Sequence, residues 1–155
     1  YDILCKTNMN SSFAEIAEIA ASHHEKYDGT GYFRGLKGEE IPFGGRILAV
    51  SDVFDAITSK RHYRSKMNIG DALDIIVKGA NKHFDEKIVN TFMNIETNQI
   101  LNVITGNKID EKDALILSKY KMQDLYGLCK NTENRKLTTE EERFLNTFNT
   151  YYNSP

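Results

Sequence analysis

The sequence predicts an all-α fold, and three observations lead to this prediction. Apolar residues recur three or four positions apart in several segments, which is typical of helices with one buried face. No alternating apolar run reaches the length of a strand. Hydrophobic residues make up 40% of the 155 residues, which is enough for a packed core and too many for a disordered chain.

Four helices are expected in the first part of the chain. The first carries a capping-box pattern, Ser12 followed by Glu15, and brings His23 and His24 to its C-terminal end. A glycine-rich stretch over residues 27–44 follows, and its aromatic and apolar residues indicate a loop that packs. The helices are expected over residues 11–24, 45–59 and 68–79 and in a segment that follows residues 83–85.

The character of the sequence changes near residue 98, and this change gives the predicted domains. Residues 1–97 are expected to form one helical domain, and residues 98–155 a helical C-terminal extension. Two further amphipathic helices are expected in the extension, over residues 109–129 and 138–152. The last helix begins with a capping-box pattern that two pairs satisfy, Thr138 with Glu141 and Thr139 with Glu142.

Charge and cysteine content exclude several classes of function. The formal net charge is -2, so the overall charge does not attract the chain to DNA, RNA or an anionic membrane. No apolar run approaches the roughly 20 residues of a membrane span. The two cysteines, Cys5 and Cys129, match no metal or redox spacing, which favours reduced thiols and a cytoplasmic protein.

A dense group of metal-binding side chains and glycines follows the first expected helix. His23 and His24 cannot both bind one ion from the regular body of a helix, but where the backbone turns both can face one pocket and serve two neighbouring metals. Imidazole suits Fe, Mn, Zn and Ni, and the N–H groups of Gly29 and Gly31 could meet a phosphate oxygen. The alternative stays open that the histidines are simply exposed and that Asp28-Gly29 is only a turn.

A second group of polar side chains lies on the helix expected over residues 45–59 and just after it. Asp52 and Asp55 lie three residues apart on an otherwise apolar helix, a costly place for carboxylates unless a cation or a donor meets them. Caps or salt bridges to Arg46 or Arg61 are the alternative for these two aspartates. Five groups suited to phosphate or base contacts follow: Lys60, Arg61, Tyr63, Arg64 and Lys66. Histidines, aspartates and arginines together indicate metal-assisted phosphodiester hydrolysis.

Short motifs follow one another in a fixed order over residues 15 to about 93. They are His23-His24-Glu25-x-x-Asp28-Gly29-x-Gly31-Tyr32, Gly35-Leu36-x-Gly38, Ile41-Pro42, Arg46-Ile47-x-Ala49-Val50-x-Asp52-x-Phe54-Asp55-Ala56, Thr58-Ser59, Arg61-x-Tyr63-Arg64 and Phe84-Asp85. In this order and spacing they resemble the HD-GYP family, a branch of the all-α HD superfamily. The resemblance implies a bacterial phosphodiesterase that hydrolyses cyclic di-GMP to linear pGpG, to GMP or to both. It also implies a cluster of divalent metal ions, with Fe or Mn favoured over Zn, Ni or Mg.

The resemblance assigns roles to individual residues. The implied metal ligands are His23, His24 and Asp52. The implied contacts to the dinucleotide are Gly31, Tyr32, Arg61 and Arg64. Asp55 would assist proton transfer, Glu25 and Asp28 would support the site, and Gly29 would have a structural role.

Two departures from the family pattern bear on function. Phe33 replaces the proline of the Gly-Tyr-Pro motif, and this Gly31-Tyr32-Phe33 loop is associated with contacts to partner signalling proteins. The His-Asp pair that names the superfamily lies upstream in the family, and only 22 residues precede His23 here.

The missing upstream ligands lead us to expect an incomplete metal site and little or no activity from this chain alone, because three ligands cannot enclose two metal ions. Three interpretations stay open. The chain is the C-terminal part of a full enzyme, or a catalytically inactive module that binds cyclic di-GMP or a partner protein, or one copy of a homodimer in which the second copy completes the core.

Overall fold

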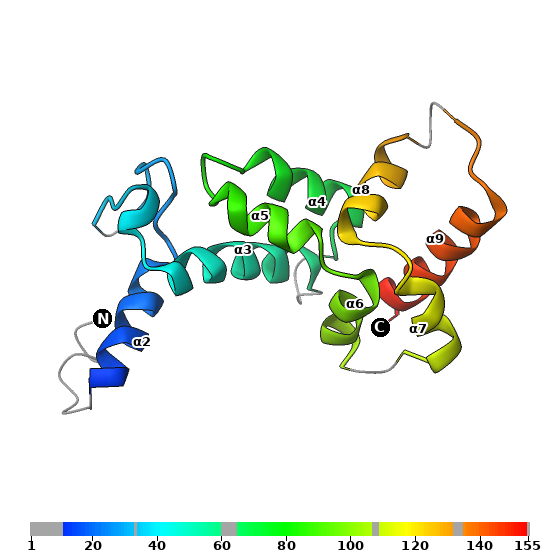
Figure 1. Ribbon diagram of the computed structural model, residues 1–155, viewed down its shortest axis with the longest axis horizontal. Coiled ribbons are helices and arrows are strands. Elements are labelled where there is room, and N and C mark those ends of the chain that lie inside the picture. Colours follow the sequence, from blue (N-terminus) through cyan, green and yellow to red (C-terminus); the bar gives the residue numbers. More distant parts are fainter. Residues whose placement is uncertain (1–10, 33, 60–64, 107–108, 132–134, 155) are drawn as a thin grey trace. The chain divides into compact units, whose positions relative to one another are not determined.

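The computed structural model describes residues 11–32, 34–59, 65–106, 109–131 and 135–154. Within these ranges the chain contains α-helices and one short 3-10 helix, with two isolated β-bridges and no strand (Figure 1). The predicted all-α class is therefore confirmed. None of the described helices is long and apolar enough to cross a membrane.

The chain forms two compact units, Tyr1–Val89 and Asn90–Pro155, which we call the first and second unit. The boundary between them falls within the helix Glu86–Met93. The predicted domain boundary after residue 97 stays a prediction, because compactness alone does not show that a segment folds as a separate domain.

The helices that begin in the first unit lie close to the positions expected from the sequence. Asn68 caps α4, since its side chain accepts a hydrogen bond of 2.8 Å from the Gly70 N–H. The Asp85 carboxylate accepts a bond of 2.8 Å from the Lys87 N–H and so caps the start of α5. The helices are α2 (Ser11–Ser22), α3 (Phe43–Thr58), α4 (Ile69–Lys78) and α5 (Glu86–Met93), with the 3-10 helix η1 at Gly38–Glu40.

Two adjacent glycines let the C-terminal part of α2 approach the start of α3 closely (Figure 1). A Cβ atom on Gly44 would lie 2.7 Å from the Cδ1 atom of Ile19. A Cβ atom on Gly45 would lie 3.0 Å from the Cβ atom of Ser22. The buried apolar side chains of the first unit's helices include Ala17, Ala49, Val50, Phe54, Ala72, Leu73 and Ile76. This packing fixes the end of α2, where the two histidines follow.

The second unit contains more helices than the sequence predicts. Its described residues form α6 (Thr97–Thr105), α7 (Glu111–Leu117), α8 (Met122–Asn131) and α9 (Thr139–Tyr152), where two helices were expected. The prediction of one continuous helix over residues 109–129 is wrong, because the helix is interrupted between α7 and α8. The Thr97 N–H donates to the Tyr120 carbonyl at 2.9 Å, and the Met122 N–H donates to the Ile95 carbonyl at 3.0 Å. These bonds to a distant segment replace the helical ones at the break.

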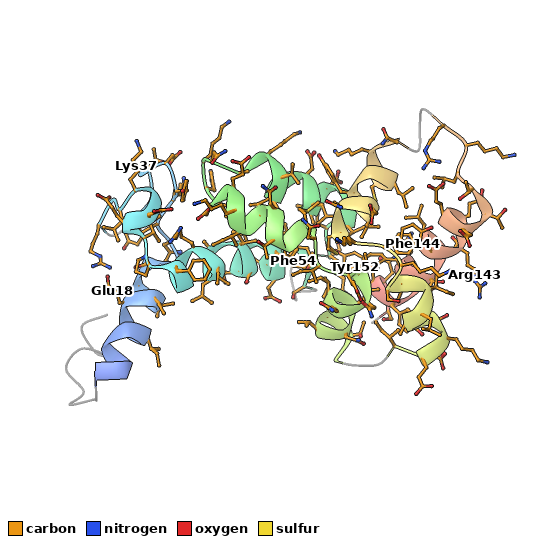
Figure 2. The ribbon with its side chains drawn as sticks, viewed as in Figure 1. Glu18, Lys37, Phe54, Arg143, Phe144 and Tyr152 are labelled. Atoms are coloured by element: carbon orange, nitrogen blue, oxygen red, sulfur yellow. The ribbon has the colours of Figure 1, made fainter. Side chains whose placement is uncertain are left out.

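Aromatic side chains of α9, among them Phe144 and Tyr152, are part of the buried core of the second unit (Figure 2). Phe144, Phe148 and Tyr152 are buried and lie four residues apart, on one face of the helix. The Tyr120 ring stacks on Phe144 with ring centroids 4.0 Å apart. Burial raises the pKa of Tyr152 to about 12.

The start of α9 has one of the two capping boxes expected from the sequence. The Thr138 hydroxyl accepts from the Glu141 N–H, and the Glu141 carboxylate accepts from the Thr138 N–H. The Arg135 guanidinium also donates to this carboxylate. The hydrogen bonds that the Glu141 carboxylate accepts, from Arg135 first, lower the pKa of Glu141 to about 2.

Candidate functional site

The two adjacent histidines lie in the turn directly after α2. The helix ends at Ser22, and the ring centroids of His23 and His24 are 3.9 Å apart at an interplanar angle of 41°. The Nδ1 atom of His23 lies 2.5 Å from the Ala20 carbonyl oxygen. Because a carbonyl only accepts, Nδ1 carries a proton, and in the neutral ring Nε2 then keeps its lone pair. The turn thus brings two imidazoles together, and the tautomer of His23 leaves one nitrogen able to bind a metal.

The next residue, Glu25, organises the loop that follows the histidines. Its side chain is 3% exposed, which is unusual for a carboxylate. One carboxylate oxygen accepts from the Arg34 N–H at 2.6 Å, and the other accepts from the Leu36 N–H at 3.2 Å. The supporting role expected for Glu25 therefore consists of fixing the loop backbone on both sides of residue 35.

The loop makes its closest approach to itself at Gly31. A Cβ atom there would lie 2.2 Å from the Lys26 backbone nitrogen and 2.5 Å from the Glu25 Cα atom. Gly29 has φ of 84°, a conformation that favours glycine, and its N–H donates to the Lys26 carbonyl at 2.8 Å. The Gly29 N–H is thus used within the loop, so the expectation that it could meet a phosphate oxygen is wrong and its structural role is supported.

Asp28 holds a local turn in the same loop. Its carboxylate accepts from the N–H of Thr30 at 2.9 Å and from the hydroxyl of Thr30 at 2.7 Å. These hydrogen bonds lower the pKa of Asp28. One alternative from the sequence was that Asp28-Gly29 forms only a turn. The contacts of Asp28 with Thr30 favour such a turn.

Replacing Gly31 with alanine is expected to destabilise the first unit by about 1–3 kcal/mol, because the new Cβ would meet backbone atoms that cannot rotate away. Urea unfolding measures the change. Gly127→Ala is the matched control, since a Cβ there meets nothing within 4 Å and the residue lies inside α8. An unchanged midpoint for Gly31→Ala would contradict the close approach.

Tyr32 is an exposed aromatic side chain beside His24. Its ring is 72% exposed, and its centroid lies 6.3 Å from that of the His24 ring. The Tyr32 N–H donates to the His24 carbonyl at 3.2 Å. The loop therefore presents a phenol ring next to the histidine pair, where it is accessible to a ligand.

The two aspartates of α3 are exposed, which differs from the sequence interpretation. We expected Asp52 and Asp55 to lie in a costly apolar setting, but both are solvated, and Asp55 accepts a bond of 2.8 Å from the Ser59 hydroxyl. Their alternative role as salt-bridge partners of Arg46 is wrong, because Arg46 pairs with Asp85. Arg61 and Arg64, the expected phosphate or guanine contacts, lie outside the described residues.

Sequence reasoning missed the ion pair between Arg46 and Asp85. The Nη1 atom of Arg46 lies 2.6 Å from the Oδ2 atom of Asp85, and their side chains are 12% and 3% exposed. Both residues belong to the motifs quoted above, but nothing in those motifs indicates that they are partners. Backbone bonds link the turn before Asp85 to the histidine loop: Asp28 N–H to the Lys82 carbonyl at 2.8 Å, and Tyr27 N–H to the His83 carbonyl at 3.2 Å.

The described residues supply part of a metal site. His23 and His24 offer neighbouring imidazoles, a ligand type that suits divalent transition metals. Within the described ranges, no group of three or more His, Cys, Asp or Glu side chains is placed to hold one ion. The structure therefore brings the two histidines together, whereas the predicted ligand Asp52 does not join them in such a group.

Comparisons with known proteins concern mainly the first unit. Residues 2–88 match the model of the HD domain family. A cyclic di-GMP phosphodiesterase of Vibrio cholerae is 49% identical over 87 residues, which are 56% of this chain and 18% of that protein. A cyclic di-GMP phosphodiesterase of Thermotoga maritima is 44% identical over 80 residues, 52% of this chain and 22% of that protein. A 3'3'-cGAMP-specific phosphodiesterase of Vibrio cholerae is 44% identical over 72 residues, 46% of this chain and 14% of that protein. The chain thus covers about a fifth or less of these relatives.

Proposed function

The chain belongs to the HD domain family, as a member of its HD-GYP branch, and from this premise we propose that it is part of a metal-dependent phosphodiesterase that hydrolyses cyclic di-GMP. The observation that carries the proposal is the histidine pair, with His24 next to the exposed Tyr32 ring. An aromatic ring beside metal-binding imidazoles can stack on a base while the phosphodiester lies at the metal. The products would be linear pGpG, GMP or both.

Each candidate residue then has a chemical task. The metal ligands would be His23, His24 and Asp52, and the exposed Asp55 carboxylate could accept a proton. A bound divalent ion supplies Lewis-acid polarisation of the phosphoryl group and a more acidic water. Fe or Mn is our proposal for the metal, ahead of Zn, Ni or Mg. Arg61 and Arg64 would hold phosphate or guanine through their guanidinium groups.

A second candidate function is an inactive module that binds cyclic di-GMP or a signalling protein. The observation that favours it is that, among the described residues, no group of three potential ligands is placed to hold a metal. The exposed Tyr32 supports a protein contact through the Gly31-Tyr32-Phe33 loop, although Phe33 lies outside the described residues. The homodimer and the cytoplasmic location remain predictions.

Turnover by the full chain tests the proposed function. The chain is incubated anaerobically with Fe²⁺ or Mn²⁺ and cyclic di-GMP, and products are followed by chromatography. The wild-type chain alone is expected to show little turnover because its metal site is incomplete, and any turnover should fall more than about 100-fold in His24→Ala, since losing even an outer partner of a metal ligand costs about 10–100-fold. The matched control is His83→Ala, which removes another exposed histidine of the first unit.

The outcomes separate the two candidate functions. Nucleotide binding without turnover by the wild-type chain would fit both the inactive module and a part of an enzyme whose metal site is incomplete, whereas turnover that His24→Ala abolishes would exclude the inactive module. If the chain neither binds nor hydrolyses cyclic di-GMP, the cyclic di-GMP proposal is contradicted. A parallel assay with 3'3'-cGAMP, the dinucleotide named for one relative, decides which nucleotide is preferred.

A further inference from the structure

We propose that the buried Arg46–Asp85 ion pair positions the metal-binding residues of the site, by fixing α3 relative to the loop that follows the histidines. This inference rests on the proposed function, because it concerns the same metal ligands. It assigns Arg46 as a positioning residue that does not itself touch the metal or the substrate.

The first step of the argument is the place of Arg46 on α3. Asp52 follows Arg46 by six residues on the same helix, which is about 9 Å along the axis at 1.5 Å per residue. A helix of this length is rigid over such a distance, so whatever fixes Arg46 also fixes the position of Asp52. The guanidinium is largely buried and also lies over the Phe43 ring, with 5.5 Å from Cζ to the ring centroid.

The second step is the rigid turn that carries Asp85. The N–H groups of His83 and Phe84 both donate to the Gly79 carbonyl, at 2.9 and 3.0 Å. A Cβ atom on Gly79 would lie 2.6 Å from the Phe84 ring, so the turn is tightly packed. Asp85 also caps α5 through Lys87, so its carboxylate is held on two sides.

The third step leads from this turn to the histidines. The Lys82 and His83 carbonyls accept hydrogen bonds from the N–H groups of Asp28 and Tyr27, which lie four and three residues after His24. A small space lined by Glu25, Tyr27, Gly45, Arg46, His83 and Asp85 admits no water molecule. Glu25 and the Asp85 side chain are each 3% exposed and the Arg46 side chain is 12% exposed, so they are shielded from bulk water, and a charge pair interacts more strongly there than in solvent.

The decisive variant removes both charges without leaving either one unpaired. Arg46→Met keeps the aliphatic stem, and Asp85→Asn keeps an oxygen that can cap α5. We expect this double variant to unfold at an unchanged urea midpoint, because replacing both partners of a buried pair is often neutral. We expect its Mn²⁺ affinity, measured from the electron paramagnetic resonance of free Mn²⁺, to fall about 10–100-fold.

The matched control is the same replacement in an ion pair whose two residues belong to one helix. Lys78 and Asp74 form an ion pair within α4, with 2.6 Å between Nζ and Oδ2. Lys78→Met with Asp74→Asn should leave Mn²⁺ affinity unchanged. Arg46→Lys keeps the cation and should recover part of the affinity that Arg46→Met loses. A folded Arg46→Met, Asp85→Asn variant with wild-type Mn²⁺ affinity would overturn the inference.

A second measurement separates this inference from the proposed function. Amide hydrogen exchange at Tyr27 and Asp28 reports on their bonds to the turn, and it should be faster in the Arg46→Met, Asp85→Asn variant. Unchanged exchange would overturn the inference whatever the metal result. If the wild-type chain binds no Mn²⁺ while exchange still accelerates, the metal-dependent function fails and the link from Arg46 to the histidine loop stands.

Discussion

Replacing Asp85 alone with alanine is expected to lower the free energy of unfolding of the first unit by about 3–5 kcal/mol. The substitution leaves the Arg46 guanidinium buried without its counter-charge, at a site where the two side chains are 12% and 3% exposed. It also removes the acceptor for the Lys87 N–H at the start of α5. Urea unfolding followed by circular dichroism measures the loss.

Asp28→Ala is the matched control for Asp85→Ala. Asp28 is also an aspartate that accepts a backbone N–H two residues later, but it makes no buried ion pair. We expect a change of no more than about 1 kcal/mol, as for other exposed turn contacts. Equal losses for the two variants would show that burial of the Arg46 charge does not determine the cost.

Replacing Phe144 with alanine is expected to destabilise the second unit by about 3–5 kcal/mol. The side chain is fully buried, and its ring stacks on Tyr120 at 4.0 Å, so its removal leaves a large cavity in the aromatic core (Figure 2). Hydrogen exchange resolved by residue measures the effect, with the greatest loss of protection expected in α6, α7 and α9, which pack together.

Leu115→Ala is the matched control for Phe144→Ala. Leu115 is also an apolar residue of the second unit, but its side chain is 69% exposed. Its truncation should change the free energy of unfolding by no more than about 0.5 kcal/mol. A loss as large as that of Phe144→Ala would indicate that Leu115 is covered in solution.

The helical elements of the first unit could be predicted from the sequence because their signals are local. The Asn68 side chain accepts a hydrogen bond from the N–H of Gly70, two residues later. This short-range cap marks the start of α4. The same holds for Thr138 and Glu141 at the start of α9. The sequence also placed the two adjacent imidazoles at the C-terminal end of the first helix, although this helix ends at Ser22, two residues earlier than predicted, and the imidazoles lie in the turn that follows.

The candidate site could be predicted only in part. The residue types and their order identified His23, His24 and Tyr32, and the structure places these three side chains near one another. The prediction that Asp52 and Asp55 lie in an apolar setting was wrong, because apolar neighbours in the sequence do not show which face of α3 is buried. Arg61 and Arg64 stay predictions.

The sequence by itself determined the helical class and the caps of α4 and α9, because propensity and capping act between neighbouring residues, and the metal ligands stay a prediction. Only the tertiary structure decided the rest. It broke the expected helix between α7 and α8, through bonds from Thr97 and Met122 to partners more than twenty residues away. It paired Arg46 with Asp85 across 39 positions and buried Glu25 under the loop. Contacts at such separations depend on how the packed elements meet, and no periodicity within either segment encodes them.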